Sequence, residues 1–177
     1  MGKFRFYHID EHYIRFLHSL DNRVQHNKGQ RRPYIGIVLS IDGVNYYVPL
    51  ESPKPNHANI KGGGPVMKLD DGRLGVMGFN NMIPVLPSCL LEFNIQEVTD
   101  QQYKMLLLNQ LEFCNKNEEV IIHRAQTTYN RAVIKKVPMY KSVCCNFVKL
   151  ERNFRKFNPH HVPKRKKANV TLPDNKT

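Results

Sequence analysis

Hydrophobic and polar residues alternate along the first half of the chain with the period of two that indicates β-strands. Residues 3–9 predict a first strand. Residues 34–41 and 44–50 predict two longer strands, and Asp42-Gly43 between them suits a two-residue turn with positive φ. The pattern therefore predicts a β-hairpin at the centre of an N-terminal sheet.

Shorter elements follow this hairpin. Residues 66–69 and 74–79 predict a second hairpin. Residues 82–86 predict an edge strand, because their proline lacks the amide hydrogen that a central strand needs. Residues 51–64 contain two prolines and three successive glycines, so they predict a loop without regular structure.

Elsewhere the hydrophobic period is that of helices. Asp10 is expected to cap a short helix, and Thr99 with Gln102 forms a capping-box pattern for a longer one. Residues 118–136 and 142–157 predict two more helices. The side chains expected to face inward on these helices are Tyr13, Phe16, Leu17, Leu20, Tyr103, Leu106, Leu107, Leu111, Cys114, Val120, Ile121, Ala125, Thr128, Ala132, Val143, Phe147, Leu150 and Phe154. A mostly antiparallel sheet packed by three or four helices is an α+β fold.

Length and composition fit one domain. The chain has 177 residues, of which 41% are hydrophobic, and this is enough to build a core. After Phe157 the sequence becomes rich in proline, lysine and arginine. We therefore expect a single domain over residues 1–157 and a basic, flexible tail over residues 158–177.

The chain is strongly basic, with 27 lysines and arginines against 15 aspartates and glutamates, a net charge of +12. This surplus favours a polyanionic partner, either nucleic acid or an anionic membrane surface, although it could also serve solubility alone. No apolar run reaches the ~20 residues of a membrane-spanning helix, and the charged N-terminus is unlike a signal peptide. We therefore expect a cytoplasmic protein without a membrane partner.

The sequence predicts neither a metal site nor a cofactor. The four cysteines, Cys89, Cys114, Cys144 and Cys145, form no C-x-x-C pair, so free thiols are expected. Carboxylates are too few and scattered for a two-metal nuclease. The glycines at 62–64 are not followed by the G-K-[ST] of a P-loop, so they either approach a phosphate or form a flexible connector.

The loop after the central hairpin is the best candidate for an active site. Ser52 offers a hydroxyl, Lys54 a cation and His57 a group that titrates near neutral pH. Prolines on both sides of Lys54 restrict the backbone, which lowers the entropy cost of holding a site ready. Together these groups could bind and polarise a phosphodiester. The alternative is that Ser-Pro-Lys-Pro is only a rigid polar turn.

Two basic regions, residues 23–32 and 149–167, could hold nucleic acid. On the predicted last helix, Arg152, Arg155 and Lys156 share one face and could follow a phosphate backbone. The alternative is an ordinary solvated charged face. The candidate contacts to RNA are Lys28, Arg31, Lys61, Lys149, Arg152, Arg155 and Lys156.

Four segments in their order and spacing resemble a known family. They are R-P-Y-I-G-I-V-L (32–39), P-L-E-S-P-K-P (49–55), N-N-M-I-P-V (80–85) and C-C-N-F-V-K-L-E (144–151). These segments are similar to those of the ToxN/AbiQ family, the toxin endoribonucleases of type III toxin–antitoxin systems, a group that includes CptN and TenpN. The resemblance extends from residue 3 to about residue 157.

The resemblance implies a strongly twisted antiparallel sheet, distantly like that of the MazF/Kid toxins. It also implies metal-independent RNA cleavage and inhibition by a small repeated pseudoknot RNA, with which the toxin forms a closed assembly. The family's active-site loop matches residues 50–54, so Ser52 and Lys54 carry over, and Arg32 matches the basic residue before the second strand. Glu51 stands where threonine or serine is common among relatives.

A nuclease without a metal would use the RNA's own 2′-OH as nucleophile and leave a 2′,3′-cyclic phosphate and a 5′-OH. Lys54 would then stabilise the charge on phosphorus or take up a proton, and Ser52 would hydrogen-bond the phosphate or the 2′-OH. His57 is expected to be either a general acid or a residue that orders the loop. The alternative function is a non-catalytic RNA-binding module. A membrane-surface protein or a DNA-binding regulator is more remote.

Overall fold

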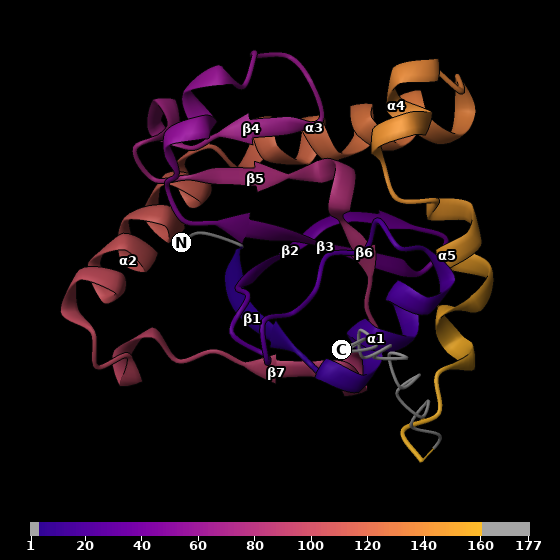
Figure 1. The fold of residues 1–177 in the computed structure, drawn as a ribbon, viewed down its shortest axis with the longest axis horizontal. Coiled ribbons are helices and arrows are strands. Elements are labelled where there is room, and N and C mark those ends of the chain that lie inside the picture. Colours follow the sequence, from indigo (N-terminus) through magenta and orange to yellow (C-terminus); the bar gives the residue numbers. More distant parts are fainter. Residues whose placement is uncertain (1–3, 161–177) are drawn as a thin grey trace, which may run out of the picture.

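A computed structural model of the chain describes residues 4–160 and confirms the α+β class. Seven strands form one antiparallel sheet with the order β4-β5-β3-β2-β1-β7, and β6 pairs with β3 beside this path. Figure 1 shows β4 and β5 at one end of the sheet and β7 at the other. The strands are β1 (Arg5–Ile9), β2 (Tyr34–Ile41), β3 (Val44–Glu51), β4 (Val66–Lys68), β5 (Val76–Gly78), β6 (Ile83–Pro84) and β7 (Leu90–Glu92).

The central hairpin of β2 and β3 is as the sequence predicts. Ile41 pairs with Val44 across the Asp42-Gly43 turn, and both turn residues have positive φ. The sequence does not predict β7, because three residues after a proline-rich segment carry no recognisable period. This strand forms only because β1 offers a free edge for pairing.

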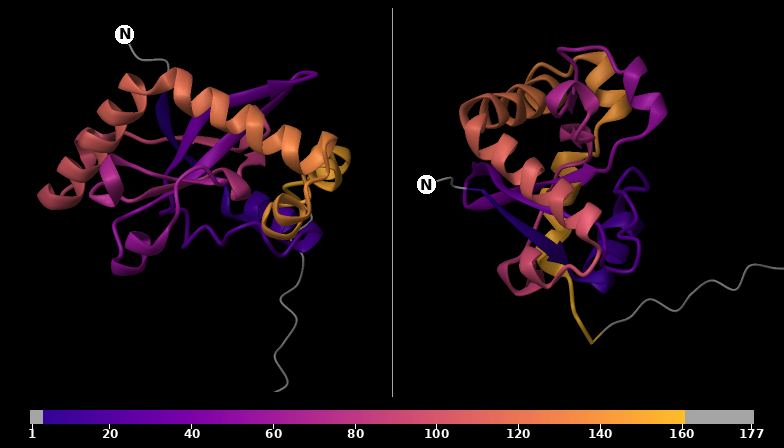
Figure 2. Two further views of the ribbon diagram at one scale, coloured as in Figure 1. Left: turned by 90° about the horizontal axis from the view of Figure 1, so that it is seen from above. Right: turned by 90° about the vertical axis from the view of Figure 1, so that its left-hand side faces the viewer.

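Five α-helices lie in the described part of the chain. They are α1 (Glu11–Leu20), α2 (Gln101–Lys116), α3 (Glu118–Tyr129), α4 (Pro138–Val143) and α5 (Phe147–Asn153). Figure 2 shows α3 running along one side of the sheet, where it contacts β2. α1 and α5 contact each other, and α5 also contacts β6.

The helix boundaries differ from the prediction in several places. Asp100, rather than Thr99, caps α2, because its carboxylate accepts a hydrogen bond from the Tyr103 amide. α3 ends at Tyr129 and continues as a π-helical segment, Asn130–Ile134. The helix predicted over 142–157 is wrong at its start, since Cys144 is extended and α5 begins only after Asn146.

Two side chains predicted to face inward are exposed. Val120 lies in the first turn of α3 and Val143 is the last residue of α4, and both are on the solvent side. The remaining predicted core positions of these helices are buried or partly buried. Of the predicted tail, residues 161–177 lie outside the part of the chain that the structure describes.

Buried tyrosines tie the helices to the sheet. The Tyr46 hydroxyl of β3 donates a hydrogen bond to the Glu151 carboxylate of α5 at 2.6 Å. The Tyr13 hydroxyl of α1 donates to the Pro84 carbonyl of β6 at 2.7 Å. A buried hydroxyl costs free energy unless it finds such a partner, so both contacts fix the packing of these helices.

At its end, the backbone of β3 is in close contact with Gly75. Glu51 pairs with Val76 of β5, and Gly75 precedes that residue with a φ of +92°. A methyl group at Gly75 would lie 1.9 Å from the Glu51 carbonyl oxygen. Only glycine therefore allows β5 to approach the end of β3, from which the loop that begins at Ser52 departs.

We expect Gly75→Ala to destabilise the protein more than Gly63→Ala. Gly63 has a similar positive φ of +84°, but a methyl group there would meet no atom within 4 Å, so this variant reports the backbone strain alone, about 1–2 kcal/mol. Gly75→Ala should lower the free energy of unfolding by a further ~1–3 kcal/mol through steric overlap. Urea denaturation of both variants measures the difference. Equal losses would contradict the close approach of the two backbones.

Candidate active site

Three basic side chains lie close to the carboxylate of Glu51, which stands at the end of β3. Lys54 Nζ lies 2.5 Å from Oε2, and Arg32 Nη1 lies 3.6 Å from Oε1. His57 Nε2 lies 3.9 Å from Oε2. Ser52 is exposed and directly follows Glu51 in the chain. The structure therefore brings together all five residues that the sequence predicted as catalytic.

Arg32 is buried, with only 7% of its surface exposed, although it carries a full charge. Its Nε donates a hydrogen bond to the His26 carbonyl at 3.0 Å, while Nη1 has no hydrogen-bond partner among the described residues. The amides of Arg31 and Arg32 both donate to the Asn27 carbonyl, and the Asn27 side chain donates to the Ile9 carbonyl of β1. The loop before β2 thus anchors the guanidinium firmly beside Glu51.

His57 lies in the 3₁₀ helix Pro55–Asn59 and is buried. Its amide donates to the Lys54 carbonyl at 3.0 Å, and its carbonyl accepts from the Ile60 amide. Its Nδ1 is buried and makes no hydrogen bond within residues 4–160. This 3₁₀ turn gives regular structure to a segment that the sequence predicted as an irregular loop.

Two polar residues that the sequence did not mark form a chain of hydrogen bonds that ends at the Glu51 carboxylate. Gln25 Nε2 donates to Glu51 Oε1 at 3.4 Å and to Asn81 Oδ1 at 2.9 Å. Asn81 Nδ2 in turn donates to the Arg23 carbonyl at 2.8 Å. Asn81 belongs to the N-N-M-I-P-V segment of the family resemblance, which was the available signal. No pattern along the chain marked Gln25.

The charged groups in this cluster shift each other's pKa values. Partial burial by itself would raise the pKa of Glu51, but the hydrogen bond and charge of Lys54, with the charges of Arg32 and Lys28, outweigh it and lower that pKa. The pKa of Lys28 is lowered, first by burial and then by the nearby charges of Arg32 and Lys54. The site is therefore crowded with positive charge that one carboxylate only partly offsets.

A pocket of about 530 Å³ opens beside this cluster. Its polar lining residues are Lys28, Arg31, Arg32, Glu51 and Ser52. Its other lining residues are Pro33, Leu50 and the rings of His8, Phe93 and Tyr103. The sequence analysis missed the three rings, because they come from β1, the residue after β7 and α2, which adjoin only in the fold.

The other predicted RNA contacts do not line this pocket. Lys61 is exposed in the loop that follows the 3₁₀ helix. Lys149 and Arg152 are exposed on α5, and Arg155 and Lys156 on the turn after it. The Arg155 guanidinium lies 4.6 Å from the Phe154 ring centroid. Lys149, Arg152, Arg155 and Lys156 form a separate basic surface, here called the α5 surface.

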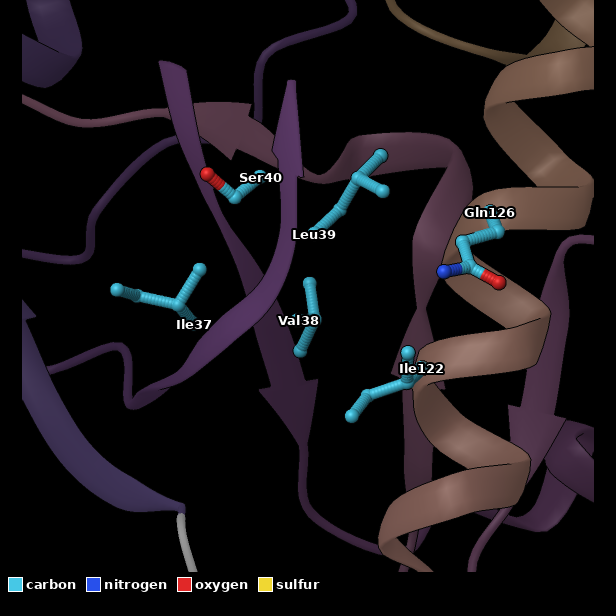
Figure 3. Close-up of a pocket in the computed structure, with 6 residues that line it drawn as sticks. All are labelled: Ile37, Val38, Leu39, Ser40, Ile122 and Gln126. Atoms are coloured by element: carbon cyan, nitrogen blue, oxygen red, sulfur yellow. The ribbon is translucent and has the colours of Figure 1, made fainter. Parts of the chain in front are cut away.

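A second pocket, of about 410 Å³, lies between β2 and α3 and has no charged lining residue. Figure 3 shows Ile122 and Gln126 of α3 on one side and Ile37, Val38, Leu39 and Ser40 of β2 on the other. This pocket offers neither a cation nor an acid–base group, whereas the pocket beside Glu51 offers both, so of these two the latter is the candidate site for phosphodiester chemistry.

Three further expectations from the sequence concern thiols, metal ligands and membrane spans. All four cysteines are buried free thiols, as predicted. In residues 4–160 no group of three or more His, Cys, Asp or Glu side chains could hold a metal ion. No helix in that stretch has the length and apolar character to span a membrane.

The family model for the toxin ToxN of type III toxin–antitoxin systems matches residues 5–155, which include every element of the pocket. The chain belongs to this ToxN family. It is 33% identical to the endoribonuclease ToxN of Bacillus thuringiensis subsp. kurstaki, over 86% of this chain and 84% of that protein. It is 30% identical to the endoribonuclease ToxN of Pectobacterium atrosepticum, over 86% and 93%.

A solved structure shares the fold of this ToxN family member. It comes from work on selective toxin inhibition by a non-coding RNA pseudoknot in type III toxin–antitoxin systems. Its sequence is 33% identical, its TM-score is 0.74, and the match covers 86% of this chain and 96% of that chain. The resemblance found in the sequence motifs is thereby confirmed at the level of family and fold.

We expect Lys54→Met to raise the pKa of Glu51, because Lys54 is the largest influence that lowers it. Lys61→Met is the matched control, since Lys61 is exposed and forms no ion pair with Glu51. Carboxyl ¹³C NMR titration measures both. An equal Glu51 pKa in the two variants would show that the ion pair is not formed in solution.

The same shift links the site to acid stability. A carboxyl whose pKa is lowered on folding stabilises the folded state above its ordinary value of 4.5 and loses this contribution as the pH falls through the lowered value. The stability advantage of the wild type over Glu51→Gln should therefore be full at neutral pH and shrink below about pH 4.5. Urea unfolding across this range gives the test, and a constant advantage would contradict it.

Proposed function

We propose that this chain is the endoribonuclease toxin of a type III toxin–antitoxin system, acting in the cytoplasm on cellular or phage RNA. The observation that carries the proposal is that Lys54 and Arg32 flank the carboxylate of Glu51, and that Glu51, Arg32 and Ser52 line one cationic pocket. The names of the two curated relatives, both endoribonucleases, support it.

The proposed reaction draws its nucleophile from the RNA. The 2′-oxygen forms a bond to the adjacent phosphorus and loses its proton, while the bond from phosphorus to the 5′-oxygen breaks and that oxygen gains a proton. The products are a 2′,3′-cyclic phosphate and a 5′-OH. Because charge builds up on the phosphoryl oxygens, the protein has to supply fixed donors and cations there, and this role needs no metal ion.

Lys54 and Arg32 supply this positive charge. Because Lys54 is ion-paired with Glu51, we assign it to the developing negative charge rather than to proton abstraction. Arg32 lines the pocket and is ion-paired with the same carboxylate, so we assign its charge to a phosphate oxygen bound there. Ser52 lines the same pocket and is assigned to hydrogen-bond the scissile phosphate or the 2′-OH.

Glu51 and His57 act as positioning residues in this proposal. Glu51 stands between the two cations, with Arg32 at one carboxylate oxygen and Lys54 at the other. His57 is 5% exposed and lies next to Glu51. Its backbone amide closes the turn by donating a hydrogen bond to the Lys54 carbonyl. This burial favours the loop-ordering role of His57 over that of general acid.

The proposed inhibitor is a small repeated pseudoknot RNA that assembles with the toxin into a closed complex. The solved relative comes from work on inhibition by such a pseudoknot, and the net charge of +12 suits a polyanionic partner. Closing an assembly requires each toxin to contact RNA at more than one place. The pocket beside Glu51 and the α5 surface offer two such places.

We expect Ser52→Ala and Lys54→Ala each to lower RNA cleavage by about 10²–10³-fold or more, since each removes one donor to the developing charge. Both positions are exposed, so the fold and the binding of antitoxin RNA should survive. Ser40→Ala and Lys135→Ala are matched controls at exposed positions outside the pocket. The measurement is cleavage in EDTA with end-group analysis.

The activity of Lys54→Arg and the end groups of the products distinguish the possible roles of Lys54 and the mechanism of cleavage. Lys54→Arg keeps the charge but does not readily give up a proton, so substantial residual activity supports electrostatic stabilisation and none supports proton transfer. Full cleavage by both alanine variants would contradict the site, and the non-catalytic RNA-binding function would replace it. A 3′-OH product would contradict attack by the 2′-OH.

The α5 surface makes a separate prediction about salt. Each neutralised phosphate of single-stranded RNA contributes about −0.7 to the slope of log affinity against log salt. Combining Arg152→Ala, Arg155→Ala and Lys156→Ala should flatten that slope by up to about 2. A control triple of exposed residues that are ion-paired elsewhere consists of Arg15→Ala, Arg73→Ala and Lys116→Ala. Equal slopes for the two triples would assign the α5 surface to solvent.

A further inference from the structure

The lining of the candidate pocket includes an aromatic platform, formed by His8 and Phe93. The rings of His8 and Phe93 are stacked, with centroids 4.2 Å apart and an interplanar angle of 22°. Phe93 is backed by Phe6, whose ring centroid lies 6.0 Å away. β1 pairs with β7, with His8 opposite Leu91, so two paired strands hold the platform in place.

Tyr103 adds a third ring from α2. It lines the same pocket, and it has no aromatic partner and no side-chain hydrogen bond among residues 4–160. The ring nitrogens of His8 likewise make no hydrogen bond in this part of the chain. Burial lowers the pKa of His8, so its ring is neutral at physiological pH. The pocket thus presents stacking faces together with polar groups that the protein leaves unpaired.

These rings share one cavity with the groups assigned to the phosphate. Arg32 and Ser52 line the cavity together with Lys28 and the three rings, whereas Lys54 reaches this cluster through its ion pair with Glu51. A nucleotide combines the same two chemistries, because its anionic phosphate is joined through the sugar to a flat base that stacks on aromatic side chains. An aliphatic or acidic ligand would use only one of the two chemistries.

We propose that His8, Phe93 and Tyr103 form a subsite for the nucleobase next to the scissile phosphate and contribute to the choice of cleavage sequence. The base stacks on the rings, and the Tyr103 hydroxyl and a His8 nitrogen hydrogen-bond its edge. The proposal rests on the proposed function for the identity of the substrate, but it concerns a different set of residues.

The first test is kinetic and uses full-length protein. RNA oligonucleotides that vary in one base on either side of the cleaved phosphate are assayed with Phe93→Leu, Tyr103→Leu and Tyr103→Phe. The leucine variants should raise KM by roughly 5- to 100-fold, the range expected for loss of one stacked base, and flatten the preference at one position. Tyr103→Phe should leave KM nearly unchanged, since stacking remains, but change the base preference. Phe113→Leu is the matched control, a partly buried ring on α2 outside the pocket.

The second test does not depend on cleavage. RNA hexanucleotides with 2′-O-methyl groups that differ in one base lack the nucleophile, so they report binding alone. Their addition should shift the ring NMR signals of His8 and Tyr103 to an extent that depends on that base. Base-dependent shifts without any cleavage by the wild type would preserve the subsite and overturn the proposed function. Cleavage with unchanged KM, unchanged base preference and no ring shifts would overturn the subsite alone and assign the rings to packing.

Discussion

The half-buried carboxylate of Glu51 is the interaction on which the rest of the site depends. It lies where β3 leaves the sheet, and its two oxygens face Arg32 and Lys54. A buried guanidinium is costly without a neighbouring negative charge, so Glu51 makes the position of Arg32 tolerable. The same carboxylate holds Lys54 close, which keeps two cations side by side at the end of β3.

The sheet makes this arrangement rigid. Glu51 is paired with Val76 of β5, and Gly75 allows the two backbones to come together. The pairing of β1 with β7 likewise fixes the His8–Phe93 stack. The loop that carries Ser52 and Lys54 and the His8–Phe93 stack thus both adjoin strands of one sheet, and sites on such elements hold their geometry better than sites on free loops.

The positive charge of the chain is divided between two places with different surroundings. In the pocket, Arg32 is buried, so its interaction with an anion is screened little by salt, whereas Lys28 is exposed. On the α5 surface the cations are exposed, and the attraction of exposed cations to a polyanion falls steeply with ionic strength. The two places therefore suit different tasks, precise contact with one phosphate and broader attraction of a polyanion.

The sequence by itself determined the central hairpin, the Asp10 cap, the family and the loop that carries Ser52 and Lys54, because strand periodicity, turn chemistry and short motifs are local along the chain. Only the tertiary structure decided that Gln25 and Asn81 support Glu51, that β7 exists, and that rings from β1 and α2 share one pocket. Likewise, it decided that Val120 and Val143 face solvent. These features depend on which distant segments pack together, and a periodic pattern cannot specify the partner that a given face or edge will meet.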